Sequence, residues 1–345
     1  MNLKEIADSA AALGTQIKAG IPIDQALRRL AQMQPSYADF WIQASMAAQS
    51  GRLLSDLLAD VWPNALVSAV RAGERAGKLD EVFGRIEETI ELQLGLRSAL
   101  AKLAYPIGMG VAGLVVFLGF MIFVLPSLAK SLDTKSKSLV FELSQWISNF
   151  ANENWVTVVA SCAVGIVALV SWLRTEKAKS LIIEILLSIP LIKDALRDMY
   201  FGLWANYMAI MFAAGIPTRE GLKITSEILP VTLQESVLVF EWDLSVNNRT
   251  MADAADPAKQ SPDDARAIWW PFYIANAFIV AEQTGEVDKE LLRVAPSLIK
   301  DGVRTLNQVI AVANAIALAL SAFLIISPLA AYYMEIFSAV RQAGR

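Results

Sequence analysis

The chain has 345 residues, of which 55% are hydrophobic and 19% are charged, and its formal net charge is −4. Soluble domains carry roughly 25% charged residues, so this composition favours a membrane protein and excludes intrinsic disorder. Histidine is absent and Cys162 is the single cysteine, which excludes histidine-dependent catalysis, histidine-ligated metals and an internal disulfide. Because there is no long basic run, nucleic acid is not an expected partner.

Residues 1–102 predict a cytoplasmic helical domain. Apolar residues recur at helical spacing, for example at Ile6, Ala10 and Leu13. The first residues lack the apolar stretch of a secretory signal peptide, so the N-terminus is expected to stay in the cytoplasm.

Two short motifs in this domain predict helix ends. In AGIP, Gly20 is expected to close one helix with a positive φ, and Pro22 to fit the first turn of the next. In ERAGKLD, Gly77 is expected to end a helix and Asp80 to lie in the first turn that follows. The same stretch has a faint likeness to a phosphate-binding P-loop, but Leu79 stands where that loop needs Ser or Thr, which argues against nucleotide binding.

Three uncharged stretches are long enough to cross the ~30 Å hydrocarbon layer of a membrane, and Trp and Tyr residues lie near their ends. Lys and Arg are more frequent on the flanks expected to face the cytoplasm, which supports an N-terminus on that side. The predicted order after the first domain is a span at 103–129, an outer loop at 130–153, a span at 154–173, a second cytoplasmic domain at 174–304, a span at 305–334 and an outer tail at 335–345.

Two other apolar segments compete for the same interpretation, at residues 199–218 and 267–281. The second is short for a span. The first is long enough, but the sequence repeat described below pairs it with a segment of the first domain that contains several charged residues. Both segments are therefore predicted to be buried helices of the second domain.

The second cytoplasmic domain repeats the motifs of the first. AGIP recurs with Gly215 and Pro217, 195 residues later, and EQTGEVD with Glu282, Gly285 and Asp288 follows ERAGKLD at a distance of 208 residues. A Trp-Pro pair precedes the second motif in both halves. The duplication predicts two related helical bundles, with extra residues in a surface loop at 245–266.

Carboxylates are the catalytic groups that remain. Glu74 with Asp80 or Glu81 could form an acid–base pair, whereas the acidic run from Glu87 to Glu91 is typical of a solvated helix face. The three predicted spans contain no charged side chain, which disfavours a transporter. A small-molecule or lipid permease and a carboxylate enzyme remain as alternatives, and no pattern predicts a cofactor or a metal.

The motif order has a counterpart in a known family. AGIP, then AGExxGxLDE at 72–81, then Tyr105–Pro106 entering a span that ends in Val-Leu-Pro resembles the GspF/PilC family, the inner-membrane platform proteins of type II secretion systems and type IV pili. The resemblance implies an all-α, polytopic protein of the bacterial inner membrane with three transmembrane helices, two homologous cytoplasmic helical-bundle domains and no enzymatic activity.

The resemblance also implies partners. They are a cytoplasmic hexameric assembly ATPase, pilin or pseudopilin subunits, other inner-membrane assembly proteins, further copies of the chain, and membrane lipid. The family motif falls on two sets of residues, expected to contact the ATPase or to support the fold: Gly73, Glu74, Gly77, Leu79 and Asp80 in the first domain, and Glu282, Gly285, Val287 and Asp288 in the second. The second copy departs from the pattern, with Ala281 in place of the glycine.

The second domain is richer in large apolar residues than the first, which predicts a contact with other subunits or with the membrane. The polar first domain is then expected to face the ATPase. The residues behind this prediction are Trp204, Tyr207, Met208, Met211, Phe212, Trp269, Trp270, Phe272 and Tyr273.

Overall fold

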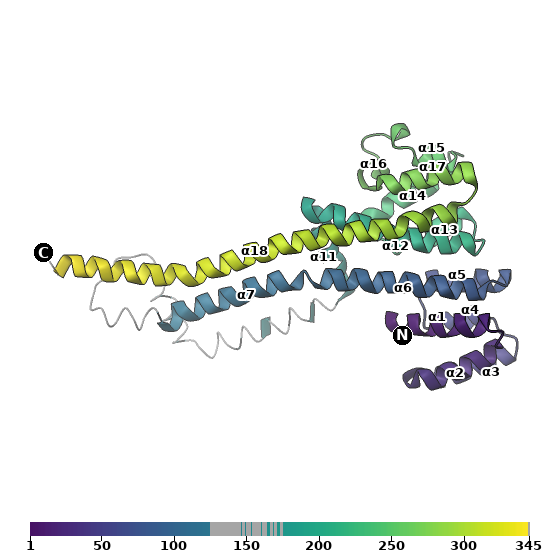
Figure 1. Cartoon of the computed structure of the whole chain (residues 1–345), viewed down its shortest axis with the longest axis horizontal. Helices are drawn as coiled ribbons and strands as arrows, with labels where there is room; N and C mark the ends of the chain where they lie inside the picture. Colours follow the sequence, from purple (N-terminus) through teal and green to yellow (C-terminus); the bar gives the residue numbers. More distant parts are fainter. Residues whose placement is uncertain are drawn as a thin grey trace. The chain divides into compact units, whose positions relative to one another are not determined.

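The structure is a computed structural model that describes residues 1–124 and 175–343, with scattered residues between 146 and 172. The described residues form helices joined by turns and contain no strand, as the all-α prediction requires (Figure 1). Most of the predicted second span, 154–173, and of the predicted outer loop, 130–153, lies outside the described residues.

The chain divides into two compact units. Unit 1 comprises Met1–Ala99 and Ile183–Leu306, so it holds nearly all of both predicted cytoplasmic domains. Unit 2 comprises Leu100–Ile182 and Asn307–Arg345. The duplication of the cytoplasmic part into two homologous domains remains a prediction.

The N-terminal part of unit 1 is a set of amphipathic helices around buried residues such as Trp41, Leu58 and Phe83. The first helix begins with a capping box, in which the Glu5 amide donates to Asn2 Oδ1 (2.9 Å) and the Asn2 amide donates to Glu5 Oε2 (2.7 Å). The elements are α1 (Leu3–Lys18), α2 (Ile23–Met33), η1 (Pro35–Tyr37), α3 (Ala38–Gln49), α4 (Leu54–Leu58), α5 (Asn64–Ala76) and α6 (Leu79–Ala101).

The C-terminal part of unit 1 is built around two antiparallel helices, α12 and α18. Gly202 and Gly302 allow their backbones to approach, because a Cβ on Gly302 would lie 2.7 Å from the Ala195 carbonyl oxygen and one on Gly202 would lie 2.6 Å from Ile299 Cγ1. The elements are α11 (Glu176–Ser188), α12 (Pro190–Ala213), α13 (Thr218–Ser226), α14 (Val231–Ser245), α15 (Met251–Ala255), η3 (Pro257–Lys259), α16 (Ala265–Trp269), α17 (Phe272–Thr284) and α18 (Val287–Ala343).

Helix α12 contributes to two hydrophobic cores. On one side, residues such as Leu203, Tyr207 and Met211 pack with the buried residues of α1 to α6. The Tyr207 hydroxyl lies 3.2 Å from Gln93 Oε1, and burial raises the pKa of Tyr207 to about 12. The segment 199–218 is therefore a buried helix followed by a turn, as predicted, and not an apolar surface facing lipid.

The other side of α12 meets a cluster of aromatic rings. Trp204 packs against Trp270 and Phe278, with ring centroids 6.2 Å apart in both pairs, and Phe240 lies 4.8 Å from Trp270. The prediction that the aromatic excess forms a contact surface is therefore wrong for the four residues that are buried in the cores, which are Trp204, Tyr207, Met208 and Met211. Phe272 and Tyr273 do stay exposed, at 70% and 53%.

Two helical stretches are long and apolar enough to cross a membrane. They are Leu79–Gly119, which includes α6 and α7 (Ala104–Gly119), and Val287–Ser327 within α18. Only 11% and 17% of their most apolar windows are buried, unlike the core helix of a soluble protein. They contain described parts of the first and third predicted spans.

Within unit 2, α7 is followed by a π-helical turn at Phe120–Val124 and contacts α18 closely. A Cβ on Gly113 would lie 2.5 Å from Ser321 Oγ, and that hydroxyl donates to the Met109 carbonyl oxygen (3.4 Å). Small residues of this kind let apolar helices pack closely in lipid.

Candidate functional site in the repeated motifs

The two AGIP sequences form the same helix corner. Gly20 and Gly215 have φ of +77° and +78°, the left-handed conformation that favours glycine. The amide of each following isoleucine, Ile21 or Ile216, donates to a carbonyl five residues earlier (3.0 and 2.9 Å). These bonds close α1 and α12 as a Schellman motif, so the predicted role of both glycines is confirmed.

The prolines of the corner lie one position earlier than expected. Pro22 and Pro217 are the N-cap residues of α2 and α13, with extended ψ of 145° and 140°, and not the first helical residues. Their fixed φ still directs the chain into the next helix. In both copies the carbonyl of the proline accepts the first helical hydrogen bond, from Ala26 and Gly221.

The glycines of the second motif also end helices. Gly77 and Gly285 have φ of +67° and +73° and stand as C-caps of α5 and α17. Asp80 follows in the first turn of α6 and Asp288 in the first turn of α18, where the helix dipole favours an acid. The architectural interpretation of these four residues accounts for their positions.

Glu74 has a structural role that the sequence did not reveal. Its Oε1 accepts the Leu54 amide (2.6 Å), and its Oε2 accepts the Ser55 amide (3.2 Å) and hydroxyl (3.0 Å). The carboxylate thus satisfies unpaired amides at the start of α4, twenty residues earlier in the chain. Both oxygens of the Glu74 carboxylate are therefore engaged at the start of α4.

Glu282 occupies the corresponding position in the second copy. Its Oε2 accepts the amide of Ala252, the second residue of α15. Ser55 is likewise the second residue of α4. Each motif glutamate therefore caps the short helix that precedes it, and this shared geometry is the strongest structural support for a duplicated fold.

At the remaining motif positions, the size of the side chain is set by the packing around it. Leu79 and Val287 are both 8% exposed and pack in the interior at the start of α6 and α18. A Cβ on Gly73 would lie 2.7 Å from Val82 Cγ2, which explains the glycine. In the second copy, Ala281 fits the equivalent position, 1% exposed.

The exposed acids of the motifs are the residues open to a partner. Asp80 and Glu81 are exposed, and Arg85 Nη2 lies 2.7 Å from Glu81 Oε1. The same Arg85 nitrogen lies 3.8 Å from Asp288 Oδ2, so an arginine of the first copy connects the two motifs. Further along α6, Glu88 and Glu91 are also exposed.

Two open grooves adjoin these motifs. One, of about 340 Å³, is lined by Asp24, Gln49, Arg52 and Glu74 among others. The other, of about 420 Å³, lies between α5 and the second AGIP corner, and its lining includes Arg71, Arg75, Gly215, Pro217 and Glu220. Motif residues of both copies thus meet at the second groove, within unit 1.

The structure also contains a buried charge network in the predicted surface loop 245–266. Arg266 is 3% exposed; its Nη1 lies 2.7 Å from Asp243 Oδ2 and donates to the Ala254 carbonyl (2.8 Å). Arg249 Nη1 also lies 2.9 Å from Asp243 Oδ2. The prediction of a surface loop is therefore wrong in part: it contains α15, η3 and the start of α16.

The ionisation of Asp243 follows from these contacts. Burial opposes the negative charge of Asp243 and would raise its pKa. Even so, the pKa of Asp243 lies below that of an ordinary carboxyl, because its carboxylate accepts hydrogen bonds from Asn247, Arg266 and Arg249 and is attracted by the Arg266 charge. No sequence pattern identified this network, since its partners come from separate segments.

Three acids of the first motif were candidates for a catalytic pair. Glu74 is engaged in helix capping, while Asp80 and Glu81 are exposed. Across residues 1–124 and 175–343, no group of three or more Cys, Asp or Glu side chains is placed to hold a metal ion. The predicted site residues therefore support the fold, apart from the exposed acids.

Known proteins resemble this chain over most of its length. Residues 10–126 match the family model of the type II secretion system (T2SS), protein F. Type II secretion system protein F of Vibrio cholerae is 22% identical over 94% of this chain and 80% of its own length. The type 4 fimbrial assembly protein PilC of Pseudomonas putida is 23% identical over 94% and 81%, and the type IV pilus assembly protein TapC of Aeromonas hydrophila is 22% identical over 84% and 70%.

The family match covers the first AGIP corner, the Glu74 motif and the first apolar helix. The relatives extend the similarity through the second copy of the motifs. In sequence, the chain is therefore similar to type II secretion system protein F and to type IV pilus assembly proteins of the PilC kind.

Proposed function

We propose that this protein is a non-enzymatic platform in the inner membrane, which binds a cytoplasmic assembly ATPase and couples its motion to the extraction or polymerisation of pilin-like subunits. The observation that supports it most is the similarity to type II secretion and type IV pilus assembly proteins, together with two long helices whose most apolar windows are largely unburied. A platform needs membrane anchors and a rigid cytoplasmic body, and it needs no catalytic group.

Three spans and a cytoplasmic N-terminus complete the proposed topology. Residues 1–102 and 174–304 then lie on the same side of the membrane, where an ATPase can reach both. The sequence repeat and the shared capping geometry of Glu74 and Glu282 support this arrangement.

The ATPase contact is proposed for the exposed acids of α6. Asp80, Glu81, Glu88 and Glu91 are exposed and recur at intervals that place most of them on one side of the helix. Glu74 is no part of this surface, because its carboxylate caps α4. Reversing the charge at Asp80 probes the surface, whereas changing Glu74 probes the fold.

The proposal is tested by deleting the gene and purifying the tagged chain from membranes of the native host. We expect loss of pili or of secreted substrate in the deletion strain and co-purification of the assembly ATPase with the chain. Normal assembly or secretion without the protein would contradict a platform role, as would a chain that never retains the ATPase.

A further inference from the structure

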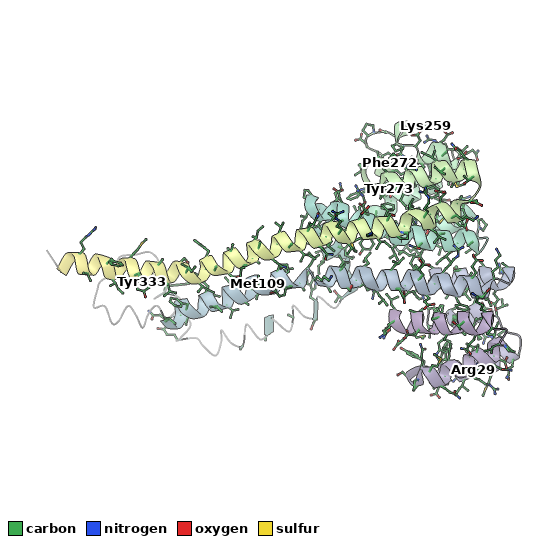
Figure 2. All side chains as sticks on the ribbon, viewed as in Figure 1. Arg29, Met109, Lys259, Phe272, Tyr273 and Tyr333 are labelled. Atoms are coloured by element: carbon green, nitrogen blue, oxygen red, sulfur yellow. The ribbon has the colours of Figure 1, made fainter. Side chains whose placement is uncertain are left out.

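An exposed aromatic corner of unit 1 has no role in the core or in the motifs. Phe272 and Tyr273 begin α17 with their side chains 70% and 53% exposed, and their ring centroids lie 6.2 Å apart (Figure 2). Ile268, at the end of α16, is 45% exposed. Adjacent large apolar side chains left in water indicate a contact surface.

The contacts of Lys193 place this corner at one end of unit 1. Because α12 and α18 are antiparallel and Ala195 lies against Gly302, the start of α12 is level with the last α18 residues of unit 1, which ends at Leu306. Lys193 Nζ lies 4.2 Å from the ring centroid of Trp269. The aromatic corner therefore belongs to the end at which α18 leaves unit 1.

The opposite end of α17 points away from that exit. After Thr284 the chain turns at Gly285 and enters α18 at Val287, the end of α18 furthest from Leu306. Gln283, which is exposed, lies ten residues beyond Tyr273, or roughly 15 Å along the helix axis. The two ends of α17 thus differ in their distance from the exit of α18.

We propose that Ile268, Trp269, Phe272 and Tyr273 contact the headgroup layer of the cytoplasmic leaflet, in the membrane that the same chain spans. The uncharged stretch of α18 follows Arg304, two residues before unit 1 ends at Leu306, so the chain enters this apolar stretch at the end of unit 1 that carries the corner. Trp and Tyr prefer this boundary because their rings are apolar and their tips polar. This inference rests on the proposed membrane platform.

The charges at the start of α12, where Lys193 meets Trp269, are compatible with a lipid headgroup. Arg197 is paired with Asp194 (3.0 Å) and Asp198 (2.9 Å), so these three leave a net charge of about −1, which Lys193 offsets. Lys193 stacks on Trp269 and can extend its ammonium towards a phosphate. The charges of residues 193–198 nearly balance, so this stretch of α12 adds little electrostatic attraction and the proposed contact depends on the aromatic rings.

The experiment places a fluorescent NBD label at single cysteines in the full chain, in a Cys162→Ser background, reconstituted in nanodiscs with nitroxide-labelled lipids. Labels go to Tyr273→Cys and Phe272→Cys in the corner, to Gln283→Cys at the far end of α17, and to Ile316→Cys in the apolar part of α18, where the native side chain is 63% exposed. We expect strong quenching of the NBD fluorescence at position 316, substantial quenching at 272 and 273, and little quenching at 283.

The outcomes separate this proposal from the platform proposal. Quenching at 316 with none at 272 or 273 would overturn the lipid contact and leave the membrane platform intact. No quenching at 316 would overturn both. If two copies of the unlabelled Tyr273→Cys variant instead formed a disulfide with each other and the labelled variant showed no quenching, the corner would be assigned to a second copy of the chain and the lipid contact would be defeated.

Discussion

In both copies of the motif the glutamate caps a short helix, but the other contacts that support that helix differ. In the first copy, Glu74 accepts three hydrogen bonds at the start of α4. In the second, Glu282 accepts the Ala252 amide, and two arginines bind the other end of α15: Arg249 donates to the Asp253 carbonyl (3.0 Å) and Arg266 to that of Ala254 (2.8 Å). The comparison shows that the capping contact of the motif glutamate recurs, while the other contacts of the short helix differ.

The largest loss of stability is expected when the ion pairs of Asp243 with Arg249 and Arg266 are broken. Asp243→Asn removes the shared charge partner of Arg249 and Arg266 while keeping the shape of the side chain. Breaking a buried pair costs about 3 kcal/mol, so we expect a clear fall in thermal stability in detergent. Asp253→Asn, which removes an exposed partner of Lys259, is the matched control and should change little.

The same network predicts a pH dependence. The pKa of Asp243 is lower in the folded protein than in the unfolded chain, where it is about 3.9. Its stabilisation is therefore fully present at neutral pH and is lost as the pH falls below about 4, through the folded pKa. Acid unfolding curves of the parent and of Asp243→Asn should converge at low pH; a constant gap between them would contradict this.

A smaller loss of stability is expected at Gly73, the motif glycine that is replaced by Ala281 in the second copy. Gly73→Ala places a Cβ against Val82, and such overpacking costs about 1–3 kcal/mol. Adding Val82→Ala should restore part of the lost stability, since the two side chains occupy one space. An additive double variant would show that the clash is not the cause. The natural Ala281 indicates that the second copy has room for this methyl group.

The smallest effect compares the two capping glutamates. Glu74→Gln weakens three hydrogen bonds and is expected to cost about 1 kcal/mol, a typical value for a helix cap. Glu282→Gln should cost less, because α15 is also held by Arg249 and Arg266. Thermal unfolding of the two variants side by side decides the order, and a larger loss at Glu282 would contradict the comparison.

Local features of the fold were predictable from the sequence, and long-range contacts were not. Gly20, Gly77, Gly215 and Gly285 were predicted correctly because a positive φ and a helix end are properties of a few consecutive residues. The capping role of Glu74 depends on amides twenty residues away, so the motif alone suggested a surface acid.

The composition was a weaker guide than the motifs. The aromatic residues of the second copy suggested a contact surface, yet Trp204 and Phe278 form a core that needs them. Burial depends on how α12, α14 and α17 pack, and no sequence periodicity contains that information. The charges of Asp243 and Arg266 were hidden for the same reason, because each appears solvated until its partner is in place.

The central claim is that the motif glutamate supports the fold while the exposed acids of α6 bind the ATPase. It is tested most directly by measuring ATPase co-purification and thermal unfolding for Asp80→Lys and Glu74→Gln in the full chain. We predict that Asp80→Lys keeps its stability and loses the ATPase, whereas Glu74→Gln loses stability and keeps the ATPase. The reverse result, with Glu74→Gln fully stable but unable to bind, would contradict the account.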